Sequence, residues 1–252
     1  FFGVTVNAAV GIATQVDTAV YSFVNNFQVA FNPQLVQSYA AQDYERNKKL
    51  ILSTSKYSFY LIAILAAPVF YFSHTLLTFW LGKHVPRYAD QLVQATLLCS
   101  LISAMAGSFW MTALAIGSSG IKQYNIILAI IDLCTVPLAY YLFSLGYSPV
   151  YAFIGKFFTA LSMQIYRFYF INKKIKFSRM EFVTYLFNIG MIFVLLLGLI
   201  YLSDTQRSYS FFEFVAEAIL LEAVLIAVII IFGLNRAEKN FLFGYILKKV
   251  KK

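Results

Sequence analysis

The sequence predicts an all-α membrane protein, a polytopic bundle of about seven transmembrane helices. Of its 252 residues, 60% are hydrophobic and only 12% are charged, whereas soluble domains carry roughly 25% charged residues. The mean hydropathy is +0.72. The net charge of +9 does not indicate nucleic-acid binding, because the charges lie mainly between apolar segments and at the C-terminal end.

Seven apolar segments have the length of a membrane span, for which a helix needs about 20 residues. Turn residues separate neighbouring segments at 117–120 and 146–149. Pro68 and Pro137 lie within the second and fourth segments, where a proline can kink a helix. The segments cover residues 4–31, 53–72, 92–116, 121–145, 150–171, 182–202 and 211–234.

The first segment is more polar than a helix surrounded by lipid, where each polar group needs a partner or water. It contains Gln15 and Asp17, and further amides and hydroxyls share one helical side. We expect that side either to bond to neighbouring helices or to line a substrate pathway. We also expect the helix to end at Asn32-Pro33, before a basic loop. The polar side consists of Asn7, Thr14, Thr18, Ser22 and Asn25.

The positions of Lys and Arg predict the orientation, because cytoplasmic connections of membrane proteins are rich in both. With the first segment ending in the cytoplasm, 16 of the 20 Lys and Arg lie at cytoplasmic connections, on their flanks or in the C-terminal tail. Lys83, Arg87 and Arg207 lie outside, and Lys156 falls within the fifth segment. The C-terminus is therefore predicted to be cytoplasmic.

Two stretches between or after the spans have patterns of their own. The connection 73–91 is the longest outside element, and Trp80 and Tyr88 are its expected interface anchors. Residues 235–252 combine apolar and Lys-rich sides, which is typical of an amphipathic helix on an anionic membrane surface or of a solubilising tail. The expected division is a transmembrane bundle over 1–234 and a cytoplasmic tail over 235–252.

Charged groups inside spans are the candidates for function, since they normally face a bundle interior or a wet cavity. The carboxyls of Asp17 and Asp132 are candidate proton or cation sites, or partners of a basic group. Lys156 either extends to the outer interface or attracts an anionic group such as a pyrophosphate. Arg167 is interpreted as an interfacial anchor. The candidate cavity residues are Lys156, Asp17, Asp132, Asn7, Gln15 and Asn25.

The sequence predicts no metal, cofactor or catalytic site. Cys99 and Cys134 lie in apolar segments without metal-ligand spacing, so both are interpreted as small buried residues. His74 and His84 lack the partners that a metal or catalytic site needs. HExxH, GxSxG and P-loop motifs do not occur. We therefore do not expect an enzyme.

Three runs of the chain resemble one family of transporters. They are NAAVGIATQV from Asn7 to Val16, NPQLVQSYA from Asn32 to Ala40, and GLNRAEKNF from Gly233 to Phe241. Over essentially its whole length the chain resembles the bacterial polysaccharide (O-antigen type) flippases. Their superfamily also holds the multidrug and toxin extrusion transporters and the peptidoglycan lipid II flippases. No site residue is transferred from the family, so the candidate residues rest on this sequence alone.

The resemblance implies a bundle of about twelve to fourteen helices in two halves, with the present chain as the C-terminal half. It also implies translocation of an undecaprenyl-pyrophosphate-linked oligosaccharide across the bacterial inner membrane by alternating access, in the biosynthesis of polysaccharides such as lipopolysaccharide O-antigen. The expected partners are this lipid-linked oligosaccharide, membrane lipids, H⁺ or Na⁺ as coupling ion, and polysaccharide-assembly proteins.

Two other functions are compatible with parts of the pattern. An ion-coupled exporter of cationic drugs on the same fold would favour acids in its cavity, whereas the candidates here are two Asp and one Lys. A membrane-bound polysaccharide polymerase or acyltransferase would need a large outside loop, and the longest one predicted is 73–91. Both are therefore ranked below the flippase.

Overall fold

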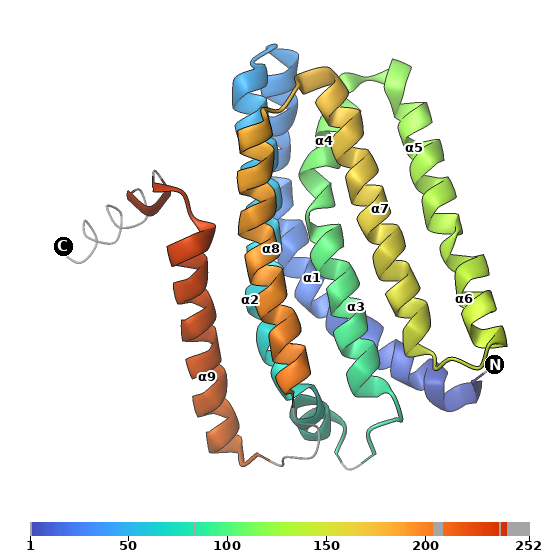
Figure 1. The fold of residues 1–252 in the computed structure, drawn as a ribbon. Coiled ribbons are helices and arrows are strands. Elements are labelled where there is room, and N and C mark those ends of the chain that lie inside the picture. The colour runs from blue at the N-terminus through green and yellow to red at the C-terminus, as the bar shows by residue number, and fades with distance from the viewer. Residues whose placement is uncertain (1, 83, 204–208, 237, 241–252) are drawn as a thin grey trace.

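The computed structural model describes residues 2–82, 84–203, 209–236 and 238–240, without the side chains at 118 and 119. These residues form helices and no strand, and the helices stand side by side as an up-and-down bundle (Figure 1). The elements are α1 Gly3–Ala40, α2 Tyr44–Leu81, α3 Ala89–Ala104, α4 Ala106–Ile116, α5 Ser118–Leu133, α6 Thr135–Ser144, α7 Val150–Ile175, α8 Arg179–Leu202, α9 Phe211–Val228 and the π-helical turn η1 Ile229–Gly233.

Five helical segments of the described chain are long and apolar enough to cross a membrane. The predicted all-α membrane bundle is confirmed at this level, whereas the predicted number of about seven spans is not. The two long helices outside this group are α1, which is rich in amides, and α7, which carries several Lys and Arg. The five segments are Tyr44–Leu81, Ala89–Ile116, Gly120–Ser144, Arg179–Leu202 and Phe211–Gly233.

The predicted end of the first helix at Asn32-Pro33 is wrong, because α1 continues to Ala40. A proline inside a helix removes one backbone hydrogen bond, and contacts with α2 offset that loss. The Asn47 amide Nδ2 donates to the Leu35 carbonyl and to the Ser38 hydroxyl, both at 2.8 Å. The last turns of α1 are thereby fixed to α2, and most of the predicted basic loop is helical.

The predicted connection at 73–91 is shorter in the structure. Although Phe72 has non-helical backbone angles (φ −107°, ψ 25°), α2 continues beyond it to Leu81. This kink lies four residues after Pro68, whereas a proline disturbs the carbonyl four residues before it, so Pro68 does not account for the kink. Gly82, with φ of 72°, then turns the chain, so the outside connection shrinks to the residues between α2 and α3.

Two predicted spans are each interrupted once. The segment predicted at 92–116 divides into α3 and α4 at Met105, and the segment predicted at 121–145 divides into α5 and α6 at Cys134. Pro137 explains the second interruption, because it has no N–H for the Leu133 carbonyl four residues earlier. The first interruption has no proline, and side chains of other helices satisfy its carbonyls, as described below.

The core is centred on α2 and α3, and the bundle thins toward both edges. Phe59, Phe70, Leu92 and Leu101 of these two helices are completely buried. A second apolar cluster around Tyr124 joins the far end of α1 to α4, α5 and α7. At one edge, α6 has no buried residue, and at the other, α9 packs mainly on α2 (Figure 1).

Candidate functional site

The polar side of α1 is exposed in the structure. Asn7, Gln15 and Asn25 are all exposed, as are Thr14 and Thr18. The two threonine hydroxyls donate to carbonyls one turn earlier in α1, at 2.9 and 2.8 Å. These hydroxyls bond within α1 itself. Together with the exposed amides they form a polar surface of α1 that the described helices leave uncovered.

Asp17 of α1 meets side chains of two other helices. The Ser100 hydroxyl of α3 donates a hydrogen bond to its carboxylate. Lys156 of α7 lies close enough for its charge to act on Asp17 and on Cys99. Ser100 is buried, Asp17 is half-buried and Lys156 is exposed. Two of the predicted site residues, Asp17 and Lys156, are therefore neighbours.

Asp132 lies farther from this pair. The hydroxyls of Thr135 and Thr159 hydrogen bond at 3.0 Å and hold α6 against the antiparallel α7. Asp132 comes one turn before Thr135, and Lys156 one turn before Thr159, so the two charges are displaced in opposite directions. Their offset along the helices is about 9 Å. Asp132 is exposed but does not share the contacts of Asp17.

Arg167 is a second cation on the side of α7 that carries Lys156. The two residues are three helical turns apart, about 16 Å along the axis. The charge of Arg167 acts on Tyr21 of α1 and on Tyr124 of α5, which places it between these helices. The interpretation of Arg167 as an interfacial anchor stays a prediction, and its spacing from Lys156 in the sequence indicates a shared helix face.

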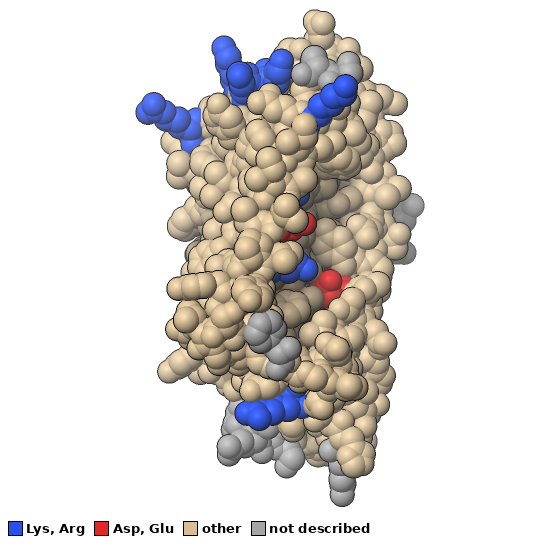
Figure 2. Space-filling view, turned by 90° about the vertical axis from the view of Figure 1, so that its right-hand side faces the viewer, with Lys and Arg blue, Asp and Glu red and all other residues tan. Residues whose placement is uncertain are grey.

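A groove on one side of the bundle contains these charges. The α1 helix packs on α2, α3 and α4, whereas α5 and α6 pack on α7. Figure 2 shows that this side of the molecule is hollowed at mid-height and that acidic and basic side chains lie in the hollow, while other Lys and Arg gather toward the ends. We define the polar groove by Asp17, Ser100, Lys156 and Arg167 together with the exposed Asn7 and Asn25, which share one side of α1, whereas Gln15 lies on nearly the opposite side from Asp17.

Other polar residues of α1 serve packing. The amide Nε2 of buried Gln28 donates to the Ser58 hydroxyl at 3.0 Å and to the Ala104 carbonyl at 2.7 Å. Ser55 donates to the Met105 carbonyl at 2.9 Å. The carbonyls freed at the α3–α4 interruption are thus satisfied by α1 and α2. The packing interpretation of the polar first helix therefore holds for Gln28, whereas the pathway interpretation stays a prediction for the exposed residues.

An ion pair between buried Lys56 and half-buried Glu238 joins α2 to the residues after α9. The Lys56 ammonium donates to both carboxylate oxygens of Glu238 at 2.8 Å. The Tyr57 hydroxyl and the Asn235 backbone N–H donate to the same carboxylate at 2.6 and 2.7 Å. Burial raises the pKa of Glu238, but these hydrogen bonds outweigh burial and hold the pKa below its ordinary value. The sequence alone gave no sign of this pair.

The structure corrects the prediction for one cysteine and adds a partner for His74. Cys99 is buried as predicted, but Cys134 is exposed, because it lies at the interruption of the peripheral α5–α6 rod. The Nδ1 atom of His74 lies 3.0 Å from a carboxylate oxygen of Asp90, so His74 has a partner. Across the described ranges, no group of three His, Cys, Asp or Glu is placed to hold a metal ion.

The predicted tail is covered only in part, because residues 237 and 241–252 lie outside the described residues.

Comparison of the chain with protein-family models, with curated proteins and with solved structures finds no match. The resemblance to polysaccharide flippases therefore stays a prediction, and the polar groove is the feature on which a function can be argued.

Proposed function

We propose that this protein translocates an undecaprenyl-pyrophosphate-linked oligosaccharide across the bacterial cytoplasmic membrane by alternating access. The observation that carries the proposal is the exposed ammonium of Lys156 in the polar groove, beside Asp17 and on the same face of α7 as Arg167. Lys156 lies about two turns inside α7, and the salt bridges among the described residues do not include it. A charge within a span is costly, so its presence favours an anionic ligand that moves through this region.

The other side of the groove supports a sugar-bearing substrate. Exposed amides at Asn7 and Asn25 both donate and accept hydrogen bonds, as sugar hydroxyls require. Hydrocarbon cannot satisfy these amides, so we propose that they face a water-filled cavity completed by further helices, as in a transporter of two halves. In that arrangement the present bundle forms one half, with its C-terminus in the cytoplasm.

Asp17 is the proposed site for a coupling ion. Its carboxylate accepts from Ser100 and lies near Lys156, so binding of H⁺ or Na⁺ at Asp17 would change the local charge that an anionic substrate meets. Asp132 is less suited to this role because it is offset from Lys156 by about 9 Å along the helices. Catalysis is not part of the proposal, and polysaccharide-assembly proteins are its expected partners.

The test is complementation of a strain that lacks its own oligosaccharide flippase, with the full-length gene. We expect surface polysaccharide to return without export of a cationic dye. Lys156→Ala should reduce the restored polysaccharide by about tenfold or more, because one charge-assisted contact to a phosphate contributes about 1.5 kcal/mol or more. Lys122→Ala, which removes an exposed cation near the start of α5, is the control.

The outcomes separate the candidate functions. Dye export without polysaccharide would contradict the proposal and favour the drug exporter, with Asp17 and Asp132 as its coupling residues. Full polysaccharide in the Lys156→Ala strain, at equal protein level, would remove Lys156 from the pathway.

A further inference from the structure

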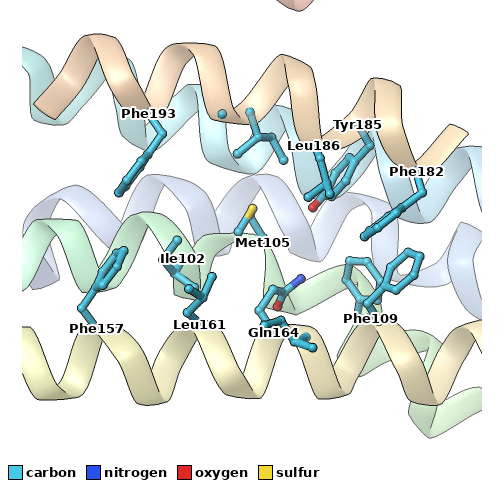
Figure 3. Close-up of a pocket in the computed structure, with 14 residues that line it drawn as sticks. Ile102, Met105, Phe109, Phe157, Leu161, Gln164, Phe182, Tyr185, Leu186 and Phe193 are labelled. Carbon is cyan, nitrogen blue, oxygen red and sulfur yellow. The ribbon is translucent and has the colours of Figure 1, made fainter. Parts of the chain in front are cut away.

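A second cavity lies on another flank of α7, facing α8. Its volume is about 370 Å³, and its walls come from α3, α4, α7 and α8. Stacked rings close both ends, with centroid distances of 5.8 Å between Phe157 and Phe193 and 4.0 Å between Phe168 and Phe182. In Figure 3, Phe157 and Phe193 lie at one end and Phe182 at the other. We call this cavity the α7–α8 slot. It is about 16 Å long, because Phe157 and Phe168 at its two ends are eleven residues apart on α7.

The slot is almost wholly apolar and opens sideways between α7 and α8. Ile165 and Leu186 on its margin are 64% and 49% exposed, and α8 is one of the helices able to cross a membrane. The hydroxyl of Tyr185 is bonded to Ser55 at 2.6 Å. The remaining polar wall residue is Gln164, which is 8% exposed and whose Oε1 has no partner among the described residues.

A cluster of cations follows directly on one end of the slot. Beyond the Phe168–Phe182 pair, the chain passes from α7 to α8 through four exposed basic residues. The nearby acid, Glu181, is engaged in its own helix cap, where it accepts from the Ser178 backbone N–H at 2.8 Å. The connection therefore carries a net positive charge at the end of an apolar slot. The four basic residues are Lys173, Lys174, Lys176 and Arg179.

We infer that the α7–α8 slot binds one acyl chain of an anionic phospholipid of the surrounding bilayer, with its phosphate on the basic α7–α8 connection. The slot runs along α7 and α8, the direction that lipid chains take beside a membrane span. Its lateral opening admits a chain from the hydrocarbon, and basic residues at a cytoplasmic membrane surface attract anionic headgroups. The site is independent of the transport function proposed above.

The test is photolabelling of the purified full chain in phosphatidylcholine vesicles. One sample contains a small fraction of phosphatidylglycerol with a diazirine midway along one acyl chain, and a second contains phosphatidylcholine with the same chain. We expect phosphatidylglycerol to label slot residues such as Met105 and Leu161. Unlabelled phosphatidylglycerol should compete for this labelling, and unlabelled phosphatidylcholine should not. Equal labelling by both lipids would overturn the inference.

Two pairs of variants test the two parts of the site. At Gly190 in the slot wall and at Gly198 outside it, an added Cβ meets no atom within 4 Å. Gly190→Phe should therefore block labelling, whereas Gly198→Phe should not. Combined Lys173→Gln, Lys174→Gln and Arg179→Gln changes should weaken phosphatidylglycerol labelling by about tenfold or more, and Lys122→Gln should leave it unchanged. Equal labelling within either pair contradicts the inference.

Gln164 distinguishes an acyl chain from other occupants. An alkyl chain cannot bond to the unpaired Oε1, so Gln164→Leu should leave labelling unchanged or raise it. A loss of labelling in Gln164→Leu would mean that the occupant hydrogen bonds to the amide, and would overturn the assignment to an alkyl chain. The competition with wild-type protein decides the inference even where a variant does not fold.

Discussion

Single charged residues have two different roles in this bundle. Lys56 is buried, and its ammonium is held by the carboxylate of Glu238, whereas Lys156 is exposed in the polar groove. A buried charge without a partner is strongly destabilising, so the first role is structural. A groove cation can instead meet water or a ligand. Removing the counter-charge of Lys56 should therefore lower the stability of the protein, whereas a change beside Lys156 should not.

For the Lys56–Glu238 pair, we expect Glu238→Gln to destabilise the protein by about 3 kcal/mol, because the Lys56 ammonium loses its counter-charge. Thermal unfolding in detergent measures the effect. The control is Glu45→Gln, which removes a surface ion pair with Lys48 at 2.6 Å and should cost at most about 1 kcal/mol. Equal midpoints for the two variants would contradict the structural role of Glu238.

The same carboxylate predicts a pH dependence. Its pKa is lower in the folded protein than its ordinary value, so its contribution to stability is present above the unfolded pKa of about 4.3 and lost as the pH falls through the folded pKa. The difference in unfolding midpoint between wild type and Glu238→Gln should therefore be largest near neutral pH and shrink below about pH 4. A constant difference across this range would count against the pair.

At the scale of elements, the α3–α4 interruption is fixed by close packing. An added Cβ at Gly107 would lie 2.0 Å from the Oε1 of Gln28, the side chain that also bonds to the Ala104 carbonyl. We expect Gly107→Ala to destabilise the protein by about 1–3 kcal/mol. Gly11→Ala is the control, because no atom lies within 4 Å of that added Cβ; equal effects of the two changes would contradict this account.

The elements also show what the sequence could and could not predict. Apolar length located the five segments able to cross a membrane, because hydrocarbon thickness sets a local requirement that a single segment meets; α1 and α7 are helices that do not meet it. Helix ends were predicted less well, since α1 passes through Pro33 owing to the contact between Asn47 and Leu35, which joins two helices. The α3–α4 interruption was missed for the same reason, because its carbonyls are satisfied by Gln28 and Ser55 from elsewhere in the chain.

For the candidate site, the sequence identified the charged side chains but not the residues that they contact. A charge inside an apolar segment is visible at once, which is why Asp17 and Lys156 were candidates. That Ser100 would bond to Asp17, or that Lys56 would meet Glu238, depends on helix rotation and long-range pairing. The exposed side of α1 was predicted as a polar stripe, and the structure adds that the described helices leave it open.

At the scale of the whole molecule, the bundle has exposed surfaces of two kinds. The α8 surface is apolar, with Val194 68% exposed, whereas the exposed side of α1 carries Asn7 and Asn25. Lipid stabilises the first kind and not the second. A membrane protein with this asymmetry must place the α1 side against water or other polar groups, and this requirement can be tested without knowledge of the substrate.

We therefore expect a cysteine at Asn25 to react with a water-soluble maleimide in membranes, and a cysteine at Val194 not to react. The background is Cys99→Ala with Cys134→Ser, because Cys134 is itself exposed. Thiolates form only in contact with water, so a position in hydrocarbon stays unmodified, and both positions should react after denaturation in detergent. Protection of Asn25→Cys to the same degree as Val194→Cys would mean that lipid or a packed helix covers α1, and the polar groove would then not be an aqueous pathway.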